Sequence, residues 1–210
     1  MKRYGLALAV GAVVIVLIGW RLGASVFSDA VEPSATESPM LDDFGALPAF
    51  SLLDAGGQPF GDQDLKGTVY IANTFFCSCV TICPFMMKQV ASVQKRLEDA
   101  GSSLRLVSIT VDPENDTPEV LSKYGEELQV DPSRWILLTG ELAVIHHLVV
   151  RGFRTAMGEP VVSDDGSYDI THSGKLFLVD GEGHVRGFWG VQDTDLDALV
   201  DAARGLAGER

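Results

Sequence analysis

The stretch TVYIANTFFCSCVTICP, residues 68–84, leads from a run of β-branched and aromatic residues directly into all three cysteines of the chain. Its first part, Thr68–Phe76, is almost devoid of polar side chains, which is typical of a strand covered on both faces. From Pro84 onward, apolar residues recur at spacings of four and three, and this period predicts an amphipathic helix through Met86, Val90, Val93, Leu97 and Ala100. The cysteines therefore lie at a strand-to-helix junction.

Outward from this junction, the chain keeps alternating between buried strands and amphipathic helices. The next helix starts at a marked signal, where Asp116 or Thr117 can act as the cap and Glu119 completes a capping box. Two short strands over 49–61 precede the junction. Further strands are expected over 104–111, 135–140, 175–180 and 184–190, with helices over 141–153 and from a cap at Thr194. Together these elements predict an α/β fold: a thioredoxin-like mixed sheet flanked by helices, with an N-terminal β-hairpin.

The composition fits one globular domain with a tail. The chain has 210 residues, of which 46% are hydrophobic, enough to bury a core. Sixteen basic and twenty-nine acidic side chains give a net charge of -13. Because such a chain repels phosphate backbones, nucleic acid is excluded as a partner.

The N-terminus carries a membrane signal. Lys2 and Arg3 precede seventeen residues, Tyr4–Trp20, that carry no charge, and about 17 apolar residues suffice to cross a bilayer. Residues 1–23 are expected to form a single-pass anchor in the inner (cytoplasmic) membrane, or alternatively a cleaved signal peptide. Either arrangement places the domain on the periplasmic or extracytoplasmic side. Residues 24–47 are predicted to be a flexible linker and residues 48–210 the folded domain.

Two of the cysteines have a spacing that suits either a disulfide or a metal ion. If the helix reaches back over Cys79 and Cys83, four residues apart, their β-carbons share one face at about 5–6 Å. That separation permits a disulfide or a pair of thiolates on one soft ion such as Cu(I), zinc or an iron cluster. The two states exclude each other, and two sulfurs alone do not complete a metal site.

One histidine is placed to supply a further ligand. His172 directly precedes the strand expected over 175–180, in the loop that faces the cysteine-bearing helix of a thioredoxin-like sheet. His146 and His147 lie in an otherwise apolar helix and His184 lies beside a hairpin turn, so these three are expected to be structural.

Four segments in this order resemble the Sco/SenC family of membrane-tethered copper proteins: TFFCSCVTICPFM, SITVDPENDTPEVLSKYGEEL, WILLTG and DITHSGKLFLVDGEGHVRGFW. The resemblance covers roughly Ala46 to Leu206. It implies a thioredoxin fold, with Cys79, Cys83 and His172 as ligands of Cu(I) or Cu(II). It also implies help in assembling the dinuclear copper centre of cytochrome c oxidase, with the copper-centre subunit of a membrane oxidase and a copper donor or thiol reductant as partners.

The sequence departs from that family pattern at Cys77, where relatives commonly have a small polar residue. Cys77 could be an extra copper ligand, a resolving thiol or a small buried apolar residue. Asp112 could tune the site or meet a partner, although an Asp-Pro turn that closes a strand explains it better. A carboxylate ligand is in doubt, since Thr171 precedes the histidine and Asp169 lies two residues further back. Met87, off the apolar stripe of its helix, could be a soft ligand or part of a docking surface.

Two functions of different kind remain open. The first is copper delivery by Cys79, Cys83 and His172 from a partly exposed site, which would make the protein a binding and delivery protein rather than an enzyme. The second is thiol-disulfide exchange, in which Cys79 and Cys83 reduce cysteines of the oxidase copper site or of another extracytoplasmic target. Copper delivery requires the histidine, whereas dithiol exchange does not.

Overall fold

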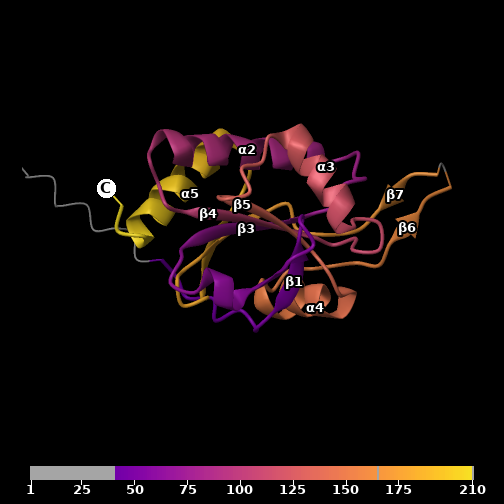
Figure 1. Cartoon of the computed structure of the whole chain (residues 1–210), viewed down its shortest axis with the longest axis horizontal. Helices are drawn as coiled ribbons and strands as arrows, with labels where there is room; N and C mark the ends of the chain where they lie inside the picture. Colours follow the sequence, from indigo (N-terminus) through magenta and orange to yellow (C-terminus); the bar gives the residue numbers. More distant parts are fainter. Residues whose placement is uncertain (1–40, 165, 210) are drawn as a thin grey trace, which may run out of the picture. The chain divides into compact units, whose positions relative to one another are not determined.

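Figure 1 shows the computed structural model of the chain, which describes residues 41–164 and 166–209. The predicted anchor over 1–23 and the predicted linker as far as residue 40 lie outside the described residues. Within the described ranges, no helix combines the length and apolar character that crossing a membrane requires.

The domain is built on a mixed sheet with the strand order β2-β1-β5-β4-β3-β8-β9. The strand that leads to the cysteines, β3, is buried along its whole length and lies between parallel β4 and antiparallel β8. β1 and β2 form the predicted N-terminal hairpin, and β9 pairs with β8 as predicted. The strands are β1 (Ser51–Asp54), β2 (Pro59–Gly61), β3 (Tyr70–Phe75), β4 (Arg105–Thr110), β5 (Trp135–Thr139), β8 (Leu176–Val179) and β9 (Val185–Trp189).

Helices cover both faces of the sheet (Figure 1). On one face α2 (Cys83–Asp99), α3 (Pro118–Leu128) and α5 (Asp193–Leu206) bury a core that includes Met86, Leu97 and Leu196. On the other face α4 (Leu142–His147), its π-helical continuation η2 (Leu148–Gly152) and the 3-10 turn η1 (Asp62–Leu65) bury a second core around Leu138, Ile145 and Phe177. This two-layered covering explains why the central strands read as continuous apolar runs.

A small hairpin that the sequence reading did not predict precedes β8. Its strands, β6 (Val161–Val162) and β7 (Tyr168–Asp169), form a separate two-stranded sheet that extends from the main sheet in Figure 1. Two-residue strands leave too short a period to be recognised in a sequence. The hairpin delivers the chain to the loop that carries His172.

The structure selects one of the two caps expected for α3 and corrects the cap expected for α5. At α3 the cap is Thr117, whose Oγ1 accepts the N–H of Val120 at 3.5 Å. Asp116 forms no capping box with Glu119, because its carboxylate is buried and turned toward the cysteine loop. At α5 the predicted cap Thr194 lies inside the helix, which begins after Gln192.

The folded domain begins upstream of the predicted start at Pro48. Residues 41–47, here called the N-terminal strap, run along the outer edge of β9, where Ala46 forms a β-bridge with His184. The N–H of Leu47 donates to the carbonyl of Gly183 at 2.8 Å, and the N–H of Phe44 donates to the carbonyl of Val185 at 2.9 Å. This end of the predicted linker is therefore part of the domain.

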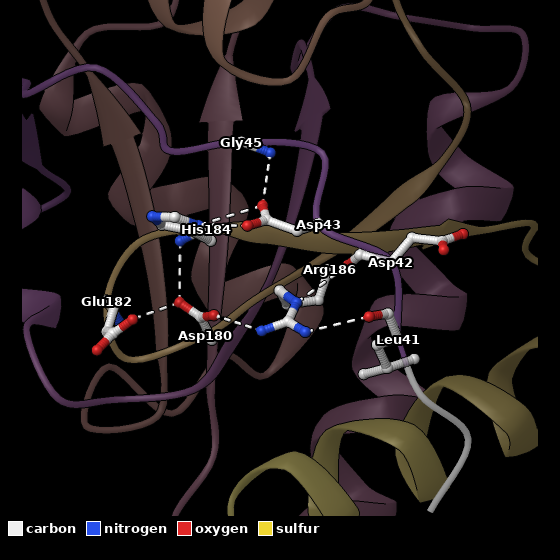
Figure 2. Close-up of polar contacts among 8 residues, drawn as sticks. All are labelled: Leu41, Asp42, Asp43, Gly45, Asp180, Glu182, His184 and Arg186. Atoms are coloured by element: carbon white, nitrogen blue, oxygen red, sulfur yellow. Dashed lines mark hydrogen bonds and ion pairs between the residues drawn. The ribbon is translucent and has the colours of Figure 1, made fainter.

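Charged side chains fasten the strap, as Figure 2 shows. The Arg186 guanidinium donates to the carbonyls of Leu41 and Asp42 and pairs with the Asp180 carboxylate at 3.0 Å. The Asp43 carboxylate lies 3.0 Å from Nδ1 of His184. By composition this stretch of Ser, Ala, Pro and acids was predicted to be a linker, and the partners that hold its last residues lie more than a hundred positions away in the sequence.

Candidate metal site

The cysteine loop starts where β3 ends. Phe75 and Phe76 are fully buried, and the following N–H, that of Cys77, donates to the Asp116 carboxylate at 3.0 Å. The N–H of Cys79 donates to the carbonyl of Phe76 at 3.4 Å, which closes a turn. Helix α2 begins only at Cys83. The helix therefore does not reach back over Cys79, which was the condition for a shared helical face, and a turn brings the two sulfurs together instead.

The loop between β7 and β8 holds the third group, His172. Its Nδ1 lies 3.1 Å from the carbonyl oxygen of Ser173, which also accepts the Thr74 hydroxyl of β3 at 3.3 Å. Since a carbonyl oxygen only accepts, Nδ1 carries the proton, and in the neutral ring Nε2 keeps a free lone pair. This Nε2 lies 3.2 Å from the Cys83 sulfur. The edge-on ring of Phe76, at 5.6 Å and 85°, supports the imidazole from the side.

These three side chains form a ready ligand cluster. The sulfurs of Cys79 and Cys83 and a ring nitrogen of His172 all lie within 4.8 Å of one another. In residues 41–164 and 166–209 this is the one group of three or more such side chains close enough to hold a metal ion. Two thiolates and an imidazole form a donor set that suits Cu(I) and other soft or borderline ions and does not suit Ca²⁺ or Mg²⁺.

Burial and hydrogen bonding give the three ligands different proton affinities. Burial lowers the pKa of His172, against opposing effects of the Ser173 carbonyl and Asp169, so the ring stays neutral and able to ligate. Burial raises the pKa of the Cys83 thiol. Burial would also raise the pKa of Cys79, but hydrogen bonds from Thr81 and from the N–H of Cys83 outweigh it and lower that pKa.

The two further candidates lie outside the cluster. Cys77 is half-buried and bound to Asp116 through its N–H, and burial followed by the charge of Asp116 raises the pKa of its thiol. The Asp112 carboxylate is buried and accepts two hydrogen bonds from the Asn115 amide, at 2.9 and 3.1 Å. This arrangement is the Asp-Pro turn that the sequence favoured for Asp112.

Met87 and Asp169, for which the sequence suggested a weaker link to the site, lie outside the cluster as well. Met87 is fully buried, and its sulfur accepts the Asn73 amide at 3.4 Å, so it is neither a ligand nor a docking surface. Asp169 is exposed on β7, outside the cluster, and its charge acts on His172 and Cys83. The Asp169 carboxylate therefore affects the pKa values of His172 and Cys83 through its charge and is not part of the cluster.

Sequence reasoning missed two neighbours of the site. Thr81 places its hydroxyl 3.3 Å from the Cys79 sulfur, and its position between the two cysteines was the only signal available. Asp116 was one of two candidate helix caps, because Glu119 follows it at the spacing of a capping box, and its contact with Cys77 spans 39 residues of chain. The residue types next to Asp116 in the sequence do not show that its carboxylate is buried against a loop 39 residues away.

Comparison with known proteins decides the family. The sequence model of the SCO1/SenC family matches residues 41–207. The chain belongs to the SCO1/SenC family. The start of this match at residue 41 coincides with the first residue of the N-terminal strap.

Individual SCO1/SenC proteins agree with this assignment. The SCO1 protein homolog of Bacillus subtilis is 29% identical over 153 residues, which cover 72% of this chain and 77% of that protein. The structure of yeast Sco1 with copper bound has a TM-score of 0.67 and 26% identity, with coverage of 79% of this chain and 90% of that chain. A structure of BsSco, described as a member of the Sco family of cytochrome c oxidase assembly proteins with a disulfide switch, has a TM-score of 0.69 and 26% identity over 81% of this chain and 98% of that chain.

Proposed function

We propose that this protein binds copper through Cys79, Cys83 and His172 and delivers it to the dinuclear copper centre of a membrane cytochrome c oxidase. The observation that carries the proposal is the convergence of two sulfurs and one imidazole lone pair within 4.8 Å. Relatives support it, since yeast Sco1 has been solved with copper bound and BsSco is described as an oxidase assembly protein.

The donor set explains why the cargo is copper. Thiolates prefer Cu(I), and a neutral imidazole is acceptable to both Cu(I) and Cu(II), so one site can hold either oxidation state. A structural zinc ion would call for a fourth protein ligand. Among the described residues, no fourth His, Cys, Asp or Glu side chain joins the cluster.

Release of the cargo starts at Cys79. Both sulfurs are buried, with exposures of 5% for Cys79 and 0% for Cys83, which is less than the partly exposed site expected from the sequence. However, Cys79 lies in a turn whose next residue, Val80, is 79% exposed. Cys83 lies in α2, and His172 is fixed through Ser173. An incoming ligand of the acceptor therefore displaces the Cys79 sulfur first, while Cys83 and His172 still hold the ion.

The proposed setting is the outer face of the cytoplasmic membrane, with residues 1–23 as a single-pass anchor. A tether raises the concentration of the domain near a membrane-bound oxidase without any added contact affinity. The segment between the anchor and the strap supplies the reach.

The metal site is tested by replacing its imidazole. His172→Ala removes the nitrogen ligand, and we expect Cu(II) affinity to fall by at least about tenfold. Replacing a residue that only hydrogen-bonds to a metal ligand already lowers metal affinity by about that factor. The Cu(II) absorption and electron paramagnetic resonance spectra should change as well. His147→Ala is the matched control, since His147 is exposed on α4 and lies outside the cluster. Unchanged copper affinity and spectra in His172→Ala would refute the proposal.

Thiol-disulfide exchange is a second candidate, favoured by the lowered pKa of the Cys79 thiol. The Cys79 thiolate would attack a target disulfide and form a mixed disulfide, releasing one target thiolate that takes up a proton. Cys83, deprotonated, would then attack the Cys79 sulfur and release the second target thiol, so that two electrons pass to the target and a Cys79–Cys83 disulfide remains. In the His172→Ala variant, full exchange activity with loss of copper binding would separate this function from delivery.

A further inference from the structure

The third sulfur of the cysteine loop lies close in sequence to the metal cluster but is not part of it. Cys77 comes two residues before Cys79, and on an extended segment both side chains would point the same way. The backbone turns instead, since the N–H of Cys79 bonds back to the carbonyl of Phe76. The cluster of mutually close ligand atoms contains Cys79, Cys83 and His172 without Cys77.

One carboxylate holds Cys77 in its place. Asp116 is 1% exposed, and one of its oxygens accepts both the N–H of Cys77 at 3.0 Å and the hydroxyl of Thr110. The thiol of Cys77 lies against the same carboxylate, close enough for a side-chain hydrogen bond. Backbone and side chain of Cys77 are thus fixed by a single residue.

Asp116 is itself rigidly placed. Its N–H donates to the carbonyl of Asp112 at 2.9 Å, in the turn that leaves β4. Thr117, the next residue, caps α3. The carboxylate is therefore anchored by β4 and α3, two elements that do not belong to the cysteine loop, and it cannot follow a movement of that loop without breaking buried hydrogen bonds.

We propose that Asp116 is a positioning residue that holds Cys77 outside the cluster and so limits the copper site to two sulfur ligands. This inference rests on the proposed copper function and deepens it. A third thiolate would bind Cu(I) more tightly, because soft ions prefer sulfur, and a tighter site releases its cargo more slowly. Keeping Cys77 away favours a site that can be emptied by an acceptor.

The test counts sulfur ligands by X-ray absorption at the copper edge, on the reduced full chain loaded with Cu(I). Wild type and Cys77→Ser should both show two sulfurs. Asp116→Ala frees Cys77 and should show three, with slower transfer of Cu(I) to a chelator. Asp116→Ala combined with Cys77→Ser should return to two. Thr110→Val is the matched control, since it removes another buried hydrogen bond of the same carboxylate and leaves Cys77 attached.

Each outcome bears on a different statement. Three sulfurs in wild type that fall to two in Cys77→Ser would show that Cys77 is a ligand and would overturn the inference, while the copper function would stand. Two sulfurs in Asp116→Ala would overturn the role of Asp116. A wild-type chain that binds no copper would overturn the proposed function itself. If Asp116→Ala does not fold, the comparison of wild type with Cys77→Ser still decides whether the third sulfur is excluded.

Discussion

At the scale of single residues, the two sulfurs of the cluster have opposite surroundings. Cys79 receives hydrogen bonds from the Thr81 hydroxyl and from the N–H of Cys83, and these favour its thiolate. Cys83 has no exposed surface, and this burial favours its protonated form. In either proposed function we therefore expect Cys79 to be the sulfur that reacts or is released first and Cys83 to be the sulfur that is retained.

Selective alkylation should reveal this difference. In the reduced, metal-free chain at about pH 7, we expect iodoacetamide to modify Cys79 more than about tenfold faster than Cys83 or Cys77, because each unit of pKa separation changes the thiolate fraction about tenfold. Peptide mass spectrometry after timed quenching measures the three rates. Thr81→Val should slow the modification of Cys79, and Thr81→Ser should restore it. Faster modification of Cys83 would contradict the assignment.

The three side chains of the cluster could be singled out from residue types and spacing, but the residues that contact them could not. Cys79, Cys83 and His172 are chemically distinctive, and a strand and a helix place them at one end of the sheet. Asp116 and Thr81 are ordinary polar residues whose role depends on where the backbone turns. The exact start of α2 could not be predicted either, because the apolar stripe of a helix does not show where its first turn begins. The helix starts at Cys83, next to Pro84, and leaves Cys79 in the preceding loop.

At the scale of secondary-structure elements, the N-terminal strap protects an edge. β9 is the last strand of the sheet, and an unpaired edge strand invites association with other chains. The strap covers it with three backbone hydrogen bonds, which link Phe44 and Gly45 to Val185 and Leu47 to Gly183. The ring of Phe44 also packs against Phe188 at 5.2 Å. The strap therefore stabilises the edge of the sheet as well as leading into the domain.

A chain that starts at Pro48 should therefore be less stable than one that starts at Leu41. Loss of the strap removes these three hydrogen bonds, each worth roughly 1 kcal/mol net, so we expect the free energy of unfolding to fall by about 1–3 kcal/mol. The shorter chain should also self-associate more readily. Urea denaturation and light scattering of the two chains measure both effects. Equal stability would show that the strap adds nothing to the fold.

The same comparison has a pH dependence. The hydrogen bond to Asp43 raises the pKa of His184 above its ordinary 6.5. Because the pKa of His184 is higher in the folded chain, its pairing with Asp43 stabilises the fold fully below pH 6.5. This contribution is lost as the pH rises through the raised pKa. The stability advantage of the longer chain should accordingly shrink above neutral pH, and in His184→Gln this pH dependence should disappear.

Most strands and helices were predictable because their apolar periods are long. β3, β4, β5, β8 and β9 each follow from a run of buried residues, and α2 and α3 from clear apolar stripes. The strap and the β6–β7 hairpin were not predictable, since neither has a period of its own. The strap is specified by distant partners such as Arg186 and His184.

At the scale of the whole molecule, the proposed function requires the domain to bind a membrane-bound acceptor through the surface around the cysteines. The chain carries a net charge of -13, yet residues 76–87 around the cysteines carry no charge at all. Val80, Ile82 and Phe85 in this segment are among the exposed large apolar side chains of the domain. The segment that an acceptor would meet in the proposed function is therefore apolar and uncharged, and the exposed Asp169 is a nearby charge that acts on His172 and Cys83.

Deletion of the gene should lower cytochrome c oxidase activity, and added copper should restore it if delivery is the physiological role. The full chain should restore activity without added copper, whereas residues 41–210 exported behind a cleavable signal peptide should restore it less well, because they lack the proposed tether that raises the local concentration. Oxidase activity in isolated membranes is the measurement. Rescue by a thiol reductant and not by copper would favour disulfide exchange instead.

The sulfur of Cys83 and the ring of His172 are separated by 89 residues, and they meet because β8 pairs with β3. A newly made chain has two thiols near one another and no imidazole beside them until that pairing exists. In the proposed function, copper would therefore bind at all three side chains only after the sheet has assembled. Bound copper would in turn stabilise the assembled state by mass action, so that a copper-loaded molecule would be one in which β8 has already paired with β3.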